Sequence, residues 1–269
     1  MKIFSKKAMK VSHRPFLLLC YIHIYKCGGS SMRRYIREHL LTTEITLVDQ
    51  WAYEWERTIK PANKLLGNFT RAEYLRNLSA TKDSQESIVI LTHSFFYEFM
   101  KNWPAFSFAT MLRDPVNRII SQFFFQKREF SFFTDSKFIK WLDSISSYEF
   151  NLQTAALSSS PNLKLARSDL ENAKANLHFF DFIGLVDEYE TSLKLFNRIY
   201  GINSNSTPPK LNVNPETPDV PAEVLKQIRE RCTYDIELLE YAQILFKAKQ
   251  AAFEMIDAGD PSIPPKSIT

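Results

Sequence analysis

Four short apolar segments recur along the chain, and polar breaks separate them from stretches with helical periodicity. The segments are 16–25 (FLLLCYIHIY), 88–92 (IVILT), 106–112 (FSFATML) and 179–186 (FFDFIGLV). Their short length and their content of β-branched and aromatic residues favour buried strands over helices. Strands that alternate with helices predict an α/β fold, with a central, mainly parallel sheet flanked by helices.

The helices between these strands carry recognisable start and stop residues. Asp114 is suited to cap a helix that begins at Pro115, and Gly201 is suited to end another. Asp187 followed by Glu190 resembles a capping box and predicts a helix start shortly after the fourth strand. The expected helices are 31–41, 115–128, 187–200 and 221–250, with further helical sequence across 130–180 around a loop near 158–162.

Two stretches have no clear pattern. Residues 45–85 are polar and mixed, and only Trp51, Tyr53 and Trp55 suggest a partly buried helix there. Residues 203–220 hold most of a loop rich in Pro and Asn, which is typical of a solvent-exposed linker but could also close over a ligand. The domain organisation expected is a flexible N-terminus at 1–15, a single domain at 16–256 and a loose tail at 257–269.

Composition narrows the class of protein. A chain of 269 residues, 45% of them hydrophobic, can bury a sizeable core as one domain. The net charge of +4 suits an anionic ligand but is too small to indicate nucleic acid. Cys20, Cys27 and Cys232 show no paired spacing, which favours a reduced compartment and gives no reason to expect a metal site.

The N-terminal segment has two interpretations. Basic residues precede the apolar run 16–24, as in a secretory signal. That run is shorter than the ~20 residues needed to span a bilayer, and it leads directly into Gly28 and Gly29. We therefore expect a strand and a cytoplasmic protein, with a Golgi-lumenal or membrane-associated protein as the alternative.

The break after the first strand has the parts of an anion site. Gly28 and Gly29 allow the backbone to approach a ligand closely, and Ser30 or Ser31 can cap the helix that follows. Free amides and the dipole at a helix N-terminus favour a phosphate group, and Lys26 adds a positive charge. Because the lysine precedes the glycines, the loop does not match the triphosphatase P-loop pattern. A tight turn without a ligand remains the alternative.

A second set of residues follows the third strand. Arg113 lies at the expected strand end, and Ser121 lies two turns into the next helix. An arginine and a hydroxyl can together bind a second phosphate. The alternative is a structural ion pair and a small helix residue. A ligand with two separated anionic ends accounts for both sets of residues at once.

These segments resemble the carbohydrate sulfotransferases. YKCGGSS at 25–31 resembles their 5′-phosphosulfate loop, close to PKTGGTS, and RDPVNRIIS at 113–121 resembles their 3′-phosphate motif, RDPxxRxxS. ILTHSFFY at 90–97 looks like the stretch that carries a histidine base in the heparan sulfate 2-O-sulfotransferase-like branch. The later segment 182–195 is also similar to the family. The resemblance covers about residues 16–250 and implies a P-loop-like three-layer sandwich.

The resemblance implies a reaction that uses PAPS as sulfuryl donor and leaves PAP. Lys26 would bind the 5′-phosphosulfate, with the backbone of Cys27, Gly28 and Gly29 and the hydroxyls of Ser30 and Ser31. Arg113 and Ser121 would hold the 3′-phosphate, and no metal would be needed. Tyr25 replaces the usual proline and Cys27 the usual threonine, so the loop loses one hydroxyl.

His93 would be the general base that takes the proton of the acceptor hydroxyl. By itself a histidine at a strand end is more often structural, and its place between the two anion motifs favours the catalytic role. A carboxylate base is the alternative, and Glu98 is close by in the sequence.

The family branch that the sequence resembles favours a saccharide or glycoconjugate hydroxyl as the acceptor. The run of phenylalanines from Phe123 to Phe133 is more typical of core than of a sugar platform. Two other functions remain open: a nucleotide kinase or triphosphatase with an atypical P-loop, and a non-catalytic protein that binds PAP or a sulfated glycan.

Overall fold

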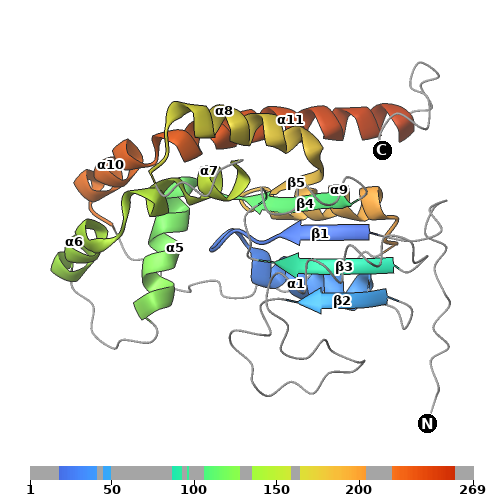
Figure 1. Ribbon diagram of the computed structural model, residues 1–269, viewed down its shortest axis with the longest axis horizontal. Coiled ribbons are helices and arrows are strands. Elements are labelled where there is room, and N and C mark those ends of the chain that lie inside the picture. The colour runs from blue at the N-terminus through green and yellow to red at the C-terminus, as the bar shows by residue number, and fades with distance from the viewer. Residues whose placement is uncertain are drawn as a thin grey trace, which may run out of the picture.

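The computed structural model describes residues 18–40, 45–49, 87–92, 96, 106–127, 135–158, 164–203 and 220–257. Within these ranges five strands form one sheet in the order β2-β3-β1-β4-β5 (Figure 1). The strands are β1 (Leu18–Ile22), β2 (Ile45–Asp49), β3 (Ser87–Thr92), β4 (Ser107–Leu112) and β5 (Phe180–Leu185). Every neighbouring pair is parallel, which confirms the predicted α/β class and parallel sheet.

β1 lies at the centre of the sheet, between β3 and β4. Its residues from Leu19 to Ile22 are buried, which explains why this strand is an uninterrupted apolar run. The chain builds β2 and β3 on one side of β1 and then crosses to β4 on the other side. Ligands bind beyond the carboxyl ends of strands at such a reversal of strand order.

Helices cover both faces of the sheet (Figure 1). The α-helices are α1 (Gly29–His39), α5 (Pro115–Lys127), α6 (Asp135–Ser144), α7 (Leu152–Leu157), α8 (Arg167–Asn176), α9 (Tyr189–Tyr200), α10 (Ala222–Arg231) and α11 (Thr233–Asp257). Two short 3-10 helices are η2 (Ser147–Asn151) and η3 (Leu177–Phe179). Among the helices in the described ranges, none is both long and apolar enough to cross a bilayer.

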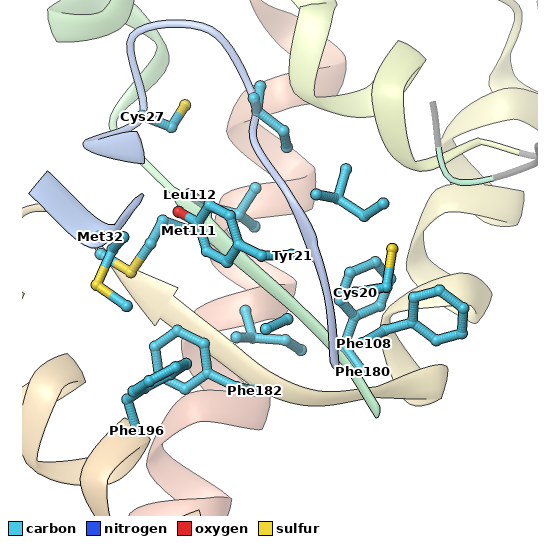
Figure 2. Close-up of a cluster of buried hydrophobic side chains, with 14 of the residues drawn as sticks. Cys20, Tyr21, Cys27, Met32, Phe108, Met111, Leu112, Phe180, Phe182 and Phe196 are labelled. Atoms are coloured by element: carbon cyan, nitrogen blue, oxygen red, sulfur yellow. The ribbon is translucent and has the colours of Figure 1, made fainter. Parts of the chain in front are cut away.

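Aromatic side chains join the helices to the sheet. On one face Phe182 of β5 meets Phe196 of α9 edge to face, with ring centroids 4.9 Å apart. On the other face the Phe96 ring lies 4.9 Å from Phe108, and the Phe96 amide donates to the Ala156 carbonyl of α7. Figure 2 shows Phe182 and Phe108 on opposite sides of β1. Because aromatic side chains pack on both faces of the sheet, the sheet forms the middle of three layers, with helices on either side (Figure 1).

β2 was not predicted. Among the described strands, Ile45–Asp49 pairs with β3 alone, and it belongs to the stretch that the sequence pattern left unassigned. A five-residue edge strand with two polar positions has too little alternation to stand out from its surroundings. The helix expected around Trp51, Tyr53 and Trp55 lies outside the described residues.

The single helix predicted at 221–250 is wrong, because the chain breaks into α10 and α11 at Cys232. The Asn151 side chain stabilises the break. Its Oδ1 accepts from the amides of Tyr234 (3.0 Å) and Asp235 (3.1 Å), and its Nδ2 donates to the Arg231 carbonyl (2.9 Å). A partner about 80 residues away in the sequence thus ends one helix and begins the next.

Candidate functional site

The loop after β1 has a left-handed backbone at two positions. Gly28 has φ 71°, and Lys26 has φ 65°, which makes it the non-glycine residue with positive φ in the described part of the chain. The Cys27 amide donates to the Ile24 carbonyl at 3.1 Å, and the Met32 amide donates to the Gly28 carbonyl at 3.2 Å. The chain therefore turns sharply and enters α1 at once.

The N-terminus of α1 has no side-chain cap. Gly28 is the N-cap residue, α1 begins at Gly29, and its first turn contains no acidic residue. The prediction that Ser30 or Ser31 caps this helix is wrong, because both lie inside it. The amides of the first turn have no partner further back in the helix, so they can receive an anion.

Gly29 lies directly against the His23 ring. A Cβ at position 29 would stand 1.6 Å from His23 Cδ2, so no larger residue fits. His23 follows β1, is buried, and donates its amide to the Thr92 carbonyl of β3 at 2.7 Å. The glycine therefore lets α1 begin close to the sheet, a reason that the sequence alone did not provide.

The two predicted anion-binding segments meet in the structure. Arg113 follows β4, and its Nη1 donates to the Lys26 carbonyl at 3.2 Å. Its Nε is buried and has no hydrogen-bond partner among the described residues. Because a buried guanidinium N–H without a partner is costly, this atom suits a site that an anion completes.

Gln153 fixes the backbone of Arg113. The Gln153 Oε1 accepts from the Arg113 amide at 2.9 Å, and its Nε2 donates to the Arg113 carbonyl at 3.0 Å. This residue comes from α7, 40 positions further along the chain. The sequence analysis missed it, since a lone glutamine in a helix gives no motif.

Asp235 in turn holds Gln153. Its buried carboxylate accepts from the amides of Gln153 (3.1 Å) and Thr154 (2.7 Å) and from Gln153 Nε2 (3.3 Å). Burial raises the pKa of Asp235, and Arg118 and these hydrogen bonds lower it to a smaller extent. Asp235 thus holds α7 and, through Gln153, the residue that carries the guanidinium.

Arg118 is the largest fully buried side chain of the described core. It lies one turn into α5, donates to Gln122 Oε1 at 2.9 Å and also donates to the Glu149 carbonyl. Its charge lowers the pKa of Asp235, so the two charges offset each other in part. Arg118 is the second arginine of RDPVNR, to which the sequence assigned no role.

Two predicted helix starts have different outcomes. Asp114 Oδ1 accepts from the Asn117 amide at 2.8 Å, which confirms it as the N-cap of α5. The capping box at Asp187 and Glu190 is wrong, because Glu188 is the N-cap of α9 and no side chain caps it. The Asp187 carboxylate instead accepts from the Asp114 amide at 3.1 Å. It therefore ties the loop after β5 to the loop after β4.

The Cys27 side chain points away from the solvent and into the core (Figure 2). Its thiol lies 3.4 Å from Gln153 Oε1, to which it can donate. Burial raises the pKa of Cys27 to about 12, so the group stays a neutral thiol near pH 7. Residue 27 can therefore reach a ligand only through its backbone.

Ser121 lies in α5 on a half-buried position, two turns from Pro115. His93 and Glu98, the two candidate bases, lie outside the described residues, as do residues 204–219 of the loop predicted at 203–220. The described structure thus brings the loop of Lys26 and the glycines against Arg113 at one edge of the sheet, and the choice of base stays a prediction.

Comparison with known sequences finds no match, and comparison with solved structures finds a distant likeness. No family model matches the chain, and no curated protein matches it. Among solved structures, the chain is similar to a sulfotransferase from Alicyclobacillus acidocaldarius at 16% identity and a TM-score of 0.46, over 86% of this chain and 96% of that one. A likeness of this size leaves the function to be argued from the site.

Proposed function

We propose that this protein is a sulfotransferase that transfers a sulfuryl group from PAPS to an acceptor hydroxyl. The observation that carries the proposal is the hydrogen bond from Arg113 to the Lys26 carbonyl. It places two positively charged segments, far apart in the sequence, at one edge of the sheet. A nucleotide with anionic groups at its 5′ and 3′ ends would engage both.

The residues fit such a nucleotide in three ways. The first turn of α1 offers uncapped amides and no acidic residue, which suits the 5′ anion. The buried Nε of Arg113 lacks a partner among the described residues and suits the 3′-phosphate, with Ser121 adding a hydroxyl. The left-handed φ of 71° at Gly28, where a Cβ would lie 3.2 Å from Val186 Cγ2, lets the chain turn sharply from Lys26 into α1.

Bound PAPS supplies a sulfuryl group activated by a phosphate leaving group. Lys26 stabilises the negative charge that develops on the bridging oxygen, as positioned cations do in phosphoryl transfer. His93, which directly follows Thr92 of β3 in the sequence, takes the acceptor proton, with Glu98 as the alternative base. The reaction uses no metal ion. The family branch that the sequence resembles favours a saccharide or glycoconjugate acceptor, and we propose a cytoplasmic enzyme.

Calorimetric titration with PAP tests the proposal, with ATP plus magnesium as the competing ligand. We expect micromolar binding of PAP, and binding roughly 10- to 100-fold weaker in Arg113→Ala, because a charge-assisted contact is lost. Arg34→Ala is the matched control, since Arg34 is an exposed arginine of α1 that pairs with Glu38.

A preference for magnesium-ATP over PAP would contradict the proposal and favour a kinase or triphosphatase. Tight PAP binding together with no transfer to any saccharide, peptide or phenol would instead favour the non-catalytic binding protein.

A further inference from the structure

The Lys26 side chain lies against two aromatic rings. Its Nζ is 4.1 Å from the centroid of the Phe125 ring and 5.8 Å from that of Tyr25. The two rings meet edge to face, with centroids 5.9 Å apart and an interplanar angle of 85°. All three side chains are half-buried. We call Tyr25 and Phe125 the aromatic seat.

The seat is well placed to act on the site. An ammonium within about 6 Å of a ring centroid is attracted by the ring face, and the attraction grows as water is excluded. Phe125 comes four residues after Ser121 in α5, so both lie on the same helix face. Phe125 therefore lies along the strip of α5 that also offers the proposed 3′-phosphate hydroxyl.

The backbone of Lys26 is also constrained. Its φ of 65° is unfavourable for a residue with a Cβ, and its carbonyl accepts from Arg113. A long, flexible side chain would lose much conformational freedom on binding an anion. With the backbone fixed by one contact and the ammonium by another, much of that freedom is already lost before the ligand arrives.

We propose that Tyr25 and Phe125 are positioning residues that hold the Lys26 ammonium in place for the 5′ anion. The inference rests on the proposed function only for the identity of that anion. It also gives a role to Tyr25, which stands where the resembling family has proline. Neither ring touches the reacting atoms in this proposal, because both act through Lys26.

Binding of PAP measures the effect on the ligand. We expect Phe125→Leu, which keeps an apolar side chain but removes the ring, to weaken PAP binding about two- to tenfold. Phe125→Tyr and Phe125→Trp keep a ring and retain binding within about twofold. Phe124→Leu is the matched control, since the Phe124 ring packs against Phe123 at 5.2 Å.

A double-mutant cycle separates positioning from packing. If the ring acts through the ammonium, Phe125→Leu has no further effect on PAP affinity in a Lys26→Met background. If the ring is merely structural, the effects of the two substitutions on the free energy of PAP binding add. Additive effects, or equal PAP affinity of the wild type and Phe125→Leu, overturn the proposal.

A measurement without nucleotide distinguishes this inference from the proposed function. Reductive methylation with ¹³C-formaldehyde keeps the lysine charge and gives each lysine an NMR signal. The Lys26 signal, identified by its loss in Lys26→Arg, should show a ring-current shift that disappears in Phe125→Leu and persists in Phe125→Tyr. A Lys26 signal without that shift would overturn the proposal that the aromatic seat holds the ammonium. A shifted signal in a protein that does not bind PAP leaves the seat in place and contradicts the proposed function.

Discussion

The loop after β1 and the loop after β4 lie at the same edge of the sheet, but different forces hold them. The first depends on backbone geometry, with left-handed residues at Lys26 and Gly28 and the close approach of Gly29 to His23. The second depends on side chains from distant helices, since Gln153 binds both backbone groups of Arg113. The conformation of the first loop thus depends mainly on residues close together in the sequence, and that of the second depends on the tertiary structure.

This difference has consequences for mutation. A change in the first loop should act through steric overlap or φ strain, and a neighbouring change should be able to relieve it. A change in the network behind the second loop leaves buried polar groups without partners, which no nearby apolar change can repair. The four predictions below follow from this contrast, from the largest expected effect to the smallest.

Asp235→Ala should have the largest effect. It removes the acceptor for the Gln153 and Thr154 amides and leaves the buried Arg118 without its nearby opposite charge. We expect the free energy of unfolding to fall by about 3–5 kcal/mol, as measured by urea denaturation. Asp235→Asn keeps an acceptor oxygen, so its free energy of unfolding should fall by less. An equal loss in both variants would show that the amide contacts contribute little.

Gly29→Ala should destabilise the protein by about 1–3 kcal/mol, because its Cβ overlaps the His23 ring. The second change His23→Ala should recover part of that loss, although by itself it destabilises. Thermal unfolding of both single variants and the double variant gives the coupling. Independent effects would mean that the helix start shifts away from the sheet instead of meeting the ring.

Lys26→Gly should separate stability from binding. Glycine adopts a φ of 65° without the strain of a Cβ, so the free energy of unfolding should rise by roughly 1 kcal/mol relative to Lys26→Met. Both variants lack the ammonium and should bind PAP weakly. Denaturation and PAP titration of the pair test this. A less stable glycine variant would contradict the strain argument.

The pH dependence of Asp235 should be the smallest effect. Burial raises its pKa in the folded protein above the ordinary value of 3.8, so the folded state takes up the proton more readily than the unfolded state. The tighter proton binding by folded Asp235 stabilises the protein in full below pH 3.8. This stabilisation is lost as the pH rises through the pKa of the folded state. The difference in unfolding free energy between wild type and Asp235→Asn should therefore decrease as the pH rises from acidic values. An increase would mean that Arg118 and the amides lower the pKa of Asp235 by more than burial raises it.

Local patterns predicted much of the fold. Four of the five described strands, the helix that starts at Pro115 and the helix end at Gly201 all carry their signal in a few adjacent residues. β2 and the break at Cys232 carry no such signal. The first is a short edge strand, and the second depends on hydrogen bonds from Asn151, whose partners lie about 80 residues away.

The sequence by itself determined the α/β fold, the turn at the glycines and the two segments with phosphate-binding composition, because each depends on neighbouring residues. Only the tertiary structure decided that Arg113 reaches Lys26, that Asp235 and Gln153 hold Arg113, and that Phe125 faces the Lys26 ammonium. Those contacts join residues from separate elements, and chain folding sets their distances. Periodicity and spacing describe one element at a time, so they cannot specify which side chains from different elements will meet.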